Sequence, residues 1–395
     1  MSSNFRYNVY NDLSTTNILI VGNPQISYFS SVYRKYTYFC VDKRESDADS
    51  INQKKSLKLQ GGGGVDLLLN ISIMFDINMG SDNIPDNVGT KVLDEVYYNL
   101  SKNSDIIEKI SGEYIDILNN LSNPIESNST YVLKSGSEYH VVSGSIHNIL
   151  SCSGGVFNNN NSSGSINNII VPIPFSFSNN PGNSMPIISF RDNSVVFTTN
   201  IKSDYNSKVN NFKYIYTSVH LFDNAESQRF LNNSNEYIYT RVYEIDIDKN
   251  KTYYDIPTYD IYNNIKSIIW KDTNNNKYNI SINSLDLFNC DDNYLDKEYF
   301  TKIFPKKAGF IGCGKSLKGD HIVDSNDICY YTFGLKNTYD NENTPSGSIN
   351  SSVNQVRIKS DNNLQMDKIY LECYNIITYG NDEAKYMFPQ YTQKS

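Results

Sequence analysis

The clearest pattern along the chain is a strict alternation of side chains with a period of two. In residues 236–248, one face of an extended strand carries Tyr237, Tyr239, Arg241, Tyr243, Ile245 and Ile247, and the other carries Ile238, Thr240, Val242, Glu244, Asp246 and Asp248. This pattern predicts a strand with one buried and one wetter face. Residues 277–282 repeat it. Residues 368–380 are apolar on both faces, as expected of a central strand in a sandwich.

Further strand candidates are spread over the whole chain. They are rich in β-branched and aromatic residues and lie between turn-forming clusters. These candidates are residues 66–77, 95–101, 194–201, 214–222, 329–335 and 355–360.

Helical periodicity is sparse. In residues 105–121, apolar side chains recur at spacings of three and four, namely Ile107, Ile110, Tyr114, Ile117, Leu118 and Leu121. Gly112 weakens the pattern, so we expect the helix mainly from Glu113 onward. A second, short helix is expected in residues 223–233, with Asp223 or Asn224 as its N-cap.

Long polar segments separate these elements. Gly61 to Gly64 predict a bend before a strand, and residues 152–168 and 338–352 are expected to be polar loops. Many short strands, frequent turns and few crossover helices favour an all-β fold of antiparallel jelly-roll sandwiches.

Composition narrows the function. The 395 residues suffice for two domains, and the formal net charge is -8. Without a long basic tract, such a chain is a poor candidate for nucleic-acid binding. No stretch has the apolar length of a membrane span, and the N-terminus lacks a signal-peptide core, so a soluble protein made in the cytosol is expected. The six cysteines form no C-x-x-C pair, which favours buried thiols.

One stretch suggests nucleotide chemistry. Residues 309–316, from Gly309 to Gly314, Lys315 and Ser316, fit the pattern G-x-x-x-x-G-K-[ST] of a phosphate-binding loop. Such a loop needs a buried strand before it and a helix after it. Pro305 and two lysines precede it, and a β-rich run follows, so we interpret the stretch as a connection.

Other candidate chemistry is equally weak. His140, His147, His220 and His321 show no metal-ligand spacing, and the acidic pairs Asp246/Asp248 and Asp291-Asp292 are typical of solvated surface. A weak calcium site at Asp246, Asp248 and Asn250 lacks the glycine and terminal glutamate of a known loop. The sequence therefore assigns no catalytic, cofactor-binding or metal residues.

Four separated segments, in order, resemble the major capsid proteins of nucleocytoplasmic large DNA viruses. They are residues 22–39 (GNPQISYFSSVYRKYTYF), 110–121 (ISGEYIDILNNL), 171–190 (VPIPFSFSNNPGNSMPIISF) and 330–352 (YYTFGLKNTYDNENTPSGSINSS). Smaller similarities occur at the strand ending in Trp270, at 282–288 with 298–300, and at 372–380. In the third segment the resemblance implies two strands around a Pro181-Gly182 turn. In the fourth, Pro345-Ser346-Gly347 predicts a tight turn that leaves Asn350 to bond nearby backbone.

The resemblance implies a double jelly roll, in which two consecutive eight-stranded antiparallel sandwiches carry short helices in their loops. We expect an N-terminal arm (1–23), a first jelly roll (24–222), a connecting helix (223–235) and a second jelly roll (236–395). It also implies a non-enzymatic virion protein without cofactors, forming a homotrimeric, pseudo-hexameric capsomer of an icosahedral shell. Expected partners are neighbouring capsomers and minor capsid proteins, near an internal membrane without insertion and without nucleic acid. Assembly in the host cytoplasm is expected.

Two departures from the family pattern keep alternatives open. Ser352 and Val353 follow Asn350-Ser351 where the family places arginine, and the connection between Trp270 and Ile282 is short. A minor capsid or assembly-scaffold paralogue is therefore one alternative. A glycan-binding β-sandwich, using the many tyrosines and asparagines, is another.

Overall fold

The structure, a computed structural model, describes residues 35–51, 53–83, 87–122, 130–135, 138–143, 163–257, 264–274, 276–288, 293–310, 316–318, 321–323, 327–335 and 345–387. The chain divides into Met1–Tyr38 and a compact unit, Phe39–Ser395. The second unit holds all of the sheets that the described residues form.

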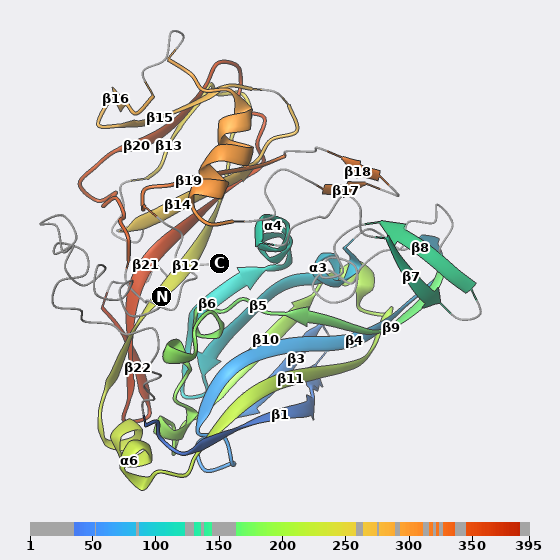
Figure 1. The fold of residues 1–395 in the computed structure, drawn as a ribbon, viewed down its shortest axis with the longest axis vertical. Coiled ribbons are helices and arrows are strands. Elements are labelled where there is room, and N and C mark those ends of the chain that lie inside the picture. Colours follow the sequence, from blue (N-terminus) through green and yellow to red (C-terminus); the bar gives the residue numbers. More distant parts are fainter. Residues whose placement is uncertain are drawn as a thin grey trace, which may run out of the picture. The chain divides into compact units, whose positions relative to one another are not determined.

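The first sandwich pairs a four-stranded with a five-stranded sheet (Figure 1). The four-stranded sheet has the order β1 (Phe39–Asp47), β11 (Val209–Leu221), β4 (Leu67–Asn83), β9 (Ser163–Pro172). The five-stranded sheet has the order β2 (Asp49–Ile51), β3 (Lys54–Leu59), β10 (Val195–Ile201), β5 (Leu93–Leu100), β6 (Asn103–Ser111). Every neighbouring pair is antiparallel.

Short helices and turns connect these strands. They are α3 (Val88–Val92), α4 (Gly112–Ser122) and the 3₁₀ turns η1 (Ser176–Ser178), η2 (Pro181–Asn183), η3 (Ile187–Ser189) and η4 (Ser203–Tyr205). Two separate hairpins are formed by β7 (Thr130–Ser135) with β8 (Glu138–Ser143), and by β17 (Ser316–Lys318) with β18 (His321–Val323).

The second sandwich follows α6 (Asn224–Asn232). Its first sheet has the order β12 (Asn235–Asp246), β21 (Lys368–Gly380), β14 (Ile265–Lys271), β19 (Ile328–Thr332), and β22 (Glu383–Tyr386) pairs with β21. Its second sheet has the order β13 (Tyr253–Asp255), β20 (Val356–Ser360), β15 (Tyr278–Ile282), β16 (Leu285–Asp286). A π-helical turn, η6 (Tyr299–Ile303), continues into α7 (Phe304–Lys307).

The sheet containing β14 and β21 is buried on both faces. On one face, Ile269 and Tyr370 belong to the same core as the first sandwich. On the other, Trp270 and Leu371 belong to the core of the second sandwich, where the Trp270 ring lies 5.2 Å from that of Tyr278. Residues 368–380 are apolar on both faces because both faces of β21 are buried.

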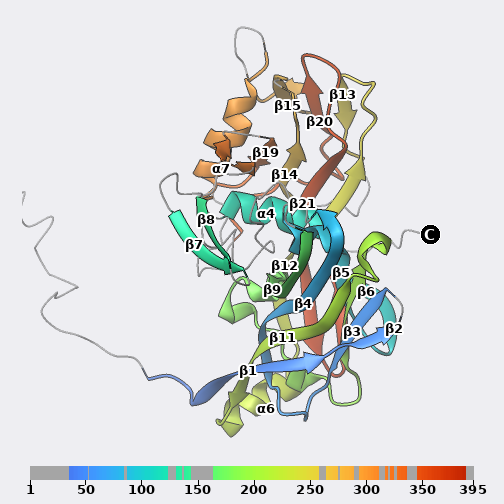
Figure 2. The same ribbon diagram turned by 90° about the vertical axis from the view of Figure 1, so that its right-hand side faces the viewer.

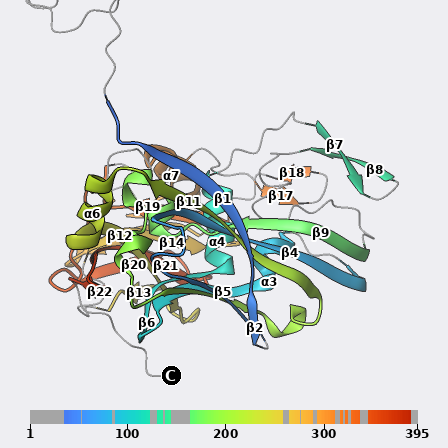
Figure 3. The ribbon, with the colours of Figure 1, turned by 90° about the horizontal axis from the view of Figure 1, so that it is seen from below.

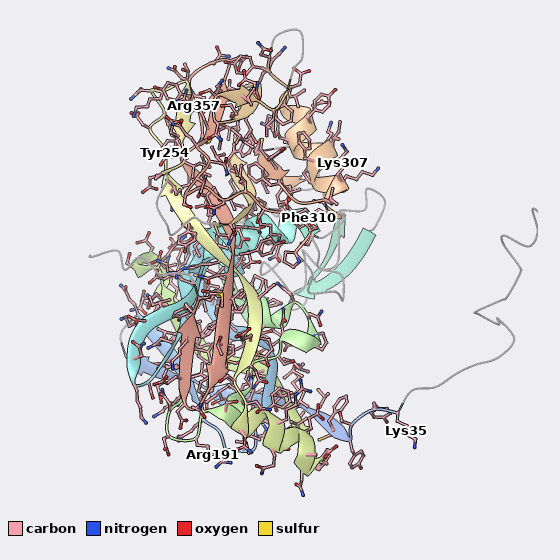
Figure 4. The ribbon with its side chains drawn as sticks, turned by 90° about the vertical axis from the view of Figure 1, so that its left-hand side faces the viewer. Lys35, Arg191, Tyr254, Lys307, Phe310 and Arg357 are labelled. Carbon is pink, nitrogen blue, oxygen red and sulfur yellow. The ribbon has the colours of Figure 1, made fainter. Side chains whose placement is uncertain are left out.

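The strands β12 and β21 are long enough to serve both sandwiches. Figure 2 and Figure 4 show them running from the second sandwich down alongside the first. At the lower end, Tyr379 packs edge-on against Phe190 of the first sandwich, with ring centroids 5.9 Å apart. The second sandwich is therefore anchored on the first through its own longest strands.

Most sequence predictions of secondary structure are confirmed. The strands predicted from alternation and β-rich composition are present, and residues 368–380 form β21 with the predicted bounds. The predicted helix in 223–233 is α6, capped by Asp223, whose carboxylate accepts a hydrogen bond from the Ala225 N–H at 2.9 Å. The turn at Gly347 has the left-handed φ of 146°, and Asn350 accepts from the Ser352 N–H at 2.9 Å.

Several boundaries differ from prediction. The helix expected mainly from Glu113 onward is confirmed as α4, which begins at Gly112. Ile107 and Ile110, part of the same periodic pattern, lie in β6, because strand pairing with β5 extends to Ser111. Residues 163–168, expected in a loop, belong to β9. The strands expected around Pro181-Gly182 are 3₁₀ turns, with an isolated bridge between Leu68 and Met185.

The count of eight strands per roll is not reproduced by the described residues, which show a four- and a five-stranded sheet in each sandwich. The helical segment η6–α7 was not predicted. No helix within the described residues is long and apolar enough to cross a membrane.

We predict that Gly112→Ala strongly destabilises the fold. A Cβ at this position would lie 2.3 Å from the Thr90 carbonyl oxygen and 2.4 Å from that of Leu93, and both are backbone atoms. Overpacking against fixed atoms costs about 3 kcal/mol. Thermal unfolding should show a clear fall in Tm, whereas the control Gly63→Ala, whose nearest contact is 3.3 Å, should show a small one. Equal Tm values for the two variants would contradict this.

Candidate functional site

The phosphate-loop candidate begins at the C-terminal end of the helix α7. The Gly309 N–H donates to the Lys306 carbonyl at 3.1 Å, and the Phe310 N–H donates to the Pro305 carbonyl at 3.0 Å. With Gly309 at φ 95°, this is a Schellman motif that ends α7. A phosphate loop leads into a helix N-terminus, where N–H groups face the anion; here the carbonyl end faces the loop.

The remaining part of that stretch gives the same interpretation. Ser316 begins the strand β17 rather than a helix. Phe310 is buried, with its ring 5.0 Å from that of Tyr330. Gly312, Gly314 and Lys315 lie outside the described residues. The structural frame of a nucleotide site is therefore missing on both described sides of the motif.

The other candidate sites are not assembled either. The Asp248 carboxylate accepts from the Asn250 N–H at 3.1 Å and lies 3.8 Å from Lys251 Nζ, so a lysine occupies the surroundings of the proposed calcium site. His220 lies beside Arg44 and Asp42 on the surface. His140 and His321 lie in β8 and β18, whereas His147, Asp291 and Asp292 fall outside the described residues. In the part that the structure describes, no three His, Cys, Asp or Glu side chains could hold a metal.

The cysteines are only partly as predicted. Cys329 and Cys373 are buried thiols, but Cys40 on the edge strand β1 is exposed. Burial raises the pKa of the Cys373 thiol. Cys152, Cys290 and Cys313 lie outside the described residues.

The most distinctive site is a buried polar seam where the two sandwiches meet. We use the term seam for Tyr98, Glu108, Tyr114, Ser176, Thr240, Ser267, Glu372 and Tyr379. These residues come from β5, β6, α4 and η1 on one side and from β12, β14 and β21 on the other.

One half of the seam centres on Glu108, which is buried. Its Oε1 accepts from the Ser176 N–H at 3.0 Å and from the Ser176 hydroxyl at 2.9 Å. Ser176 reaches across to β12, because its Oγ lies 3.0 Å from the Thr240 carbonyl and accepts from the Thr240 N–H at 3.0 Å. Tyr98 donates to Glu108 Oε2 at 3.4 Å, and its hydroxyl lies 3.2 Å from that of Tyr379.

Burial raises the pKa of Glu108 to about 8, and the hydrogen bonds from Ser176 and Tyr98 offset only part of that shift. The geometry fits a protonated carboxyl. The Ser176 hydroxyl has one proton for two acceptors, Glu108 Oε1 and the Thr240 carbonyl. A neutral Glu108 can donate its own proton to Ser176 Oγ, which leaves the serine proton for Thr240.

The other half of the seam centres on Glu372, in the middle of β21. Tyr114 of α4 donates to its Oε1, and Ser267 of β14 donates to its Oε2. Lys266 Nζ lies 3.5 Å from Oε2, and both side chains are almost fully buried. The carboxylate is thus paired and hydrogen-bonded, which buried charge requires.

The seam is continued at its lower edge by contacts of a turn. The Asp192 N–H donates to the Asp382 carboxylate at 2.9 Å, and Asn193 Nδ2 donates to the Asp382 carbonyl at 3.0 Å. The Ser189 hydroxyl donates to the carbonyl of Phe230 in α6 at 2.8 Å. These bonds hold the β21–β22 turn and α6 to the first sandwich. The seam and these bonds thus join the two sandwiches.

The comparisons with known proteins decide the family. The model "Major capsid protein N-terminus" matches residues 27–240, which is more than half of the chain. The chain belongs to the major capsid protein family. Members of this family are structural components of the virion shell, so the prediction of a non-enzymatic capsid protein is confirmed.

Solved structures show the same fold. The chain is similar to a structure of the PBCV-1 virus capsid, with 16% identity and a TM-score of 0.67, covering 92% of this chain and all of that one. PBCV-1 VP54 gives 15% identity and 0.65 over the same shares. The Faustovirus major capsid protein gives 8% identity and 0.59, covering 92% of this chain and 94% of that one. No curated protein sequence matched. The capsid protein therefore has the double jelly-roll fold that its sequence predicted.

The residues of the seam were not singled out by sequence reasoning. A signal was present, because Glu108 and Glu372 each interrupt an apolar strand, in IIEKI and YLECY. A carboxylate inside a strand that is buried on both faces must find partners. The pattern of residues 103–111 alone does not reveal that Glu108 is buried.

We predict that Glu108→Gln removes a pH dependence of stability. Because the pKa of Glu108 is raised from 4.5 to about 8, its contribution to stability is fully present below pH 4.5 and is lost as the pH rises towards 8. Glutamine mimics the neutral carboxyl. Thermal unfolding of both proteins should be measured between pH 4.5 and 8 at one protein concentration. As the pH rises, the Tm of the wild type should fall relative to that of the variant. The exposed control Glu236→Gln should follow the wild type, and parallel curves for Glu108→Gln would contradict the assignment.

We also predict that Glu372→Ala costs at least about 3 kcal/mol of unfolding free energy, because it removes the buried carboxylate that pairs with Lys266 and accepts from Ser267. The control is Glu244→Ala, which removes a more exposed pair with Lys368 and should cost less than about 1 kcal/mol. Denaturant unfolding measures both values. Similar costs for the two variants would show that the buried pair contributes no more to stability than the exposed one.

Proposed function

We propose that this capsid protein forms a homotrimeric, pseudo-hexameric capsomer of an icosahedral shell of a large DNA virus. The observation that carries the proposal is the junction of two similar sandwiches into one unit by the seam. Three copies then present six comparable wedges, and a ring with true threefold symmetry fills a hexagonal position. Neighbouring capsomers and minor capsid proteins would be its partners.

Two properties support a position in the shell rather than on the genome. The formal net charge of -8 disfavours contact with nucleic acid. The seam also makes the subunit stiff, because relative motion of the sandwiches would break the bonds from Ser176 to Thr240 and from Tyr114 to Glu372. The proposal places the subunit outside an internal membrane without insertion, with assembly in the host cytoplasm and residues 1–23 as an arm towards neighbours.

The domain boundaries belong to the same proposal. Phe222 would end the first jelly roll, α6 would be the connection, and the second roll would run from β12 to the C-terminus. Position of α6 between β11 and β12 supports this division.

The mass of the purified protein in solution tests the trimer. We expect about three times 45.0 kDa by light scattering coupled to size exclusion, at protein concentrations high enough for the trimer to be the dominant species. A stable monomer at every concentration would contradict the proposal. A trimer present in virions at far fewer copies than another double jelly-roll protein would instead favour the minor capsid role.

A further inference from the structure

The segment η6–α7 presents an exposed face of mixed character. Tyr299, Lys302, Ile303, Lys306 and Lys307 recur at the spacing of one helical face and are all exposed. Tyr299 and Ile303 expose 40% and 42% of their surface. Figure 4 shows Lys307 on the outer side of this helix. The buried side is occupied by Phe300, which contacts Trp270.

The lysines of this face form few ion pairs with the described residues. Lys302 Nζ lies 3.4 Å from Glu298, an exposed pair one turn away. Lys306 and Lys307 have no ion pair with any residue that the structure describes. A basic, partly apolar face is unusual on a chain whose formal net charge is -8. Its natural partner is an acidic surface with apolar side chains.

The chain carries such a surface on its own edge strand. Figure 3 shows β1 at the outside of its sheet, where β11 is its one strand partner among the described residues. The side chains of Asp42, Arg44 and Ser46 are half-buried, whereas Phe39, Val41, Lys43, Glu45 and Asp47 point outward. Val41 exposes 53% of its surface, and the Asp47 side chain exposes 89%. Asp49 follows in β2 and is also exposed.

The two faces match in the order of their side chains. Along β1, the apolar end with Phe39 and Val41 is followed by an acidic end with Glu45 and Asp47, and Asp49 follows at the start of β2. Along the helix, Tyr299 and Ile303 are followed by Lys306 and Lys307. Val41 and Glu45 are about 13 Å apart on an extended strand. Ile303 and Lys307 are about 6 Å apart along the helix, and their long side chains span the rest.

Lys213 does not neutralise the acidic end of β1. It lies 3.9 Å from Glu45 and 4.0 Å from Asp47, at the limit of an ion pair, while both acids stay exposed. Lys43 is the one basic residue on the outward face of β1. Edge strands that carry charge avoid pairing with other strands, which leaves this face suited to a side-chain contact with a helix.

We propose that the helix face Tyr299–Lys307 of one copy binds the outward face of β1 in the next copy of the capsomer. This inference rests on the proposed homotrimer and names its contact. Two different patches on one chain make a heterologous contact, the kind that closes a threefold ring. The apolar residues provide most of the affinity, and the charges fix the register and speed association.

Charge reversal with rescue tests this pairing. Lys306→Glu combined with Lys307→Glu should raise the trimer dissociation constant at least tenfold at physiological salt, measured by sedimentation. Adding Glu45→Lys and Asp47→Lys should restore the trimer. The control, Lys102→Glu with Lys202→Glu, changes the charge equally at exposed positions and should leave the trimer intact.

The outcomes separate this inference from the proposed function. A wild type that stays monomeric overturns the trimer and the contact together. A trimeric wild type whose reversed variant is equally trimeric overturns the contact alone. Dissociation without rescue assigns the helix face to another occupant, such as an acidic protein or an anionic lipid surface, and overturns its pairing with β1.

A second experiment does not depend on destabilising the trimer. In a Cys40→Ser background, Lys306→Cys and Asp47→Cys together should form disulfide-linked dimers and trimers on non-reducing gels under mild oxidation. Each single substitution should give no such ladder. Absence of cross-linked species from a trimeric double variant would contradict the contact.

Discussion

Two glutamates buried between the sandwiches constrain the arrangement of the rest of this molecule. Glu372 lies in a strand that faces both cores and accepts from Tyr114 of the first sandwich and from Ser267 of the second. Glu108 lies in the first sandwich and is linked to the second through Ser176, which bonds to Thr240. Shifting the sandwiches while they stay packed would leave buried polar groups without hydrogen bonds, which is far costlier than the modest net gain from forming them. The seam therefore fixes one relative position of the two rolls.

Such a junction explains how a protein without an active site performs its function. A shell subunit must keep its shape while its outer surfaces bind several neighbours. The sheet of β12, β21, β14 and β19 belongs to both cores at once, so deformation of one sandwich would be felt in the other. The aromatic contacts of Tyr379 and the bonds of Asp382 extend the same constraint to the far end of the long strands.

The sequence predicted this fold well where one physical signal dominates. Alternation and β-rich composition located the strands, and the N-cap Asp223 located α6. The unpredicted helix η6–α7 contains Pro305, which in the sequence argued against a regular strand at this position. The structure places this proline in the first turn, where its missing N–H costs little. Phe300 and Phe304, four residues apart and with rings 5.2 Å apart, were the available signal.

The site was harder to predict than the fold for a different reason. A glutamate in a strand is normally exposed, and only tertiary packing shows that Glu108 and Glu372 are enclosed. Conversely, the pattern around Lys315 matched a nucleotide loop by letters alone. The direction of α7, which ends at Gly309 where the motif begins, excludes that interpretation, and the motif itself does not encode this direction.

Hydrogen exchange, measured by mass spectrometry on the intact protein, tests the central claim that the seam makes one rigid body of the two rolls. The account predicts that peptides from β5 and β6 and peptides from β14 and β21 open with the same free energy, in a single cooperative event. If the second sandwich exchanged its core amides while the first remained protected, the rolls would be independent and the account would be contradicted.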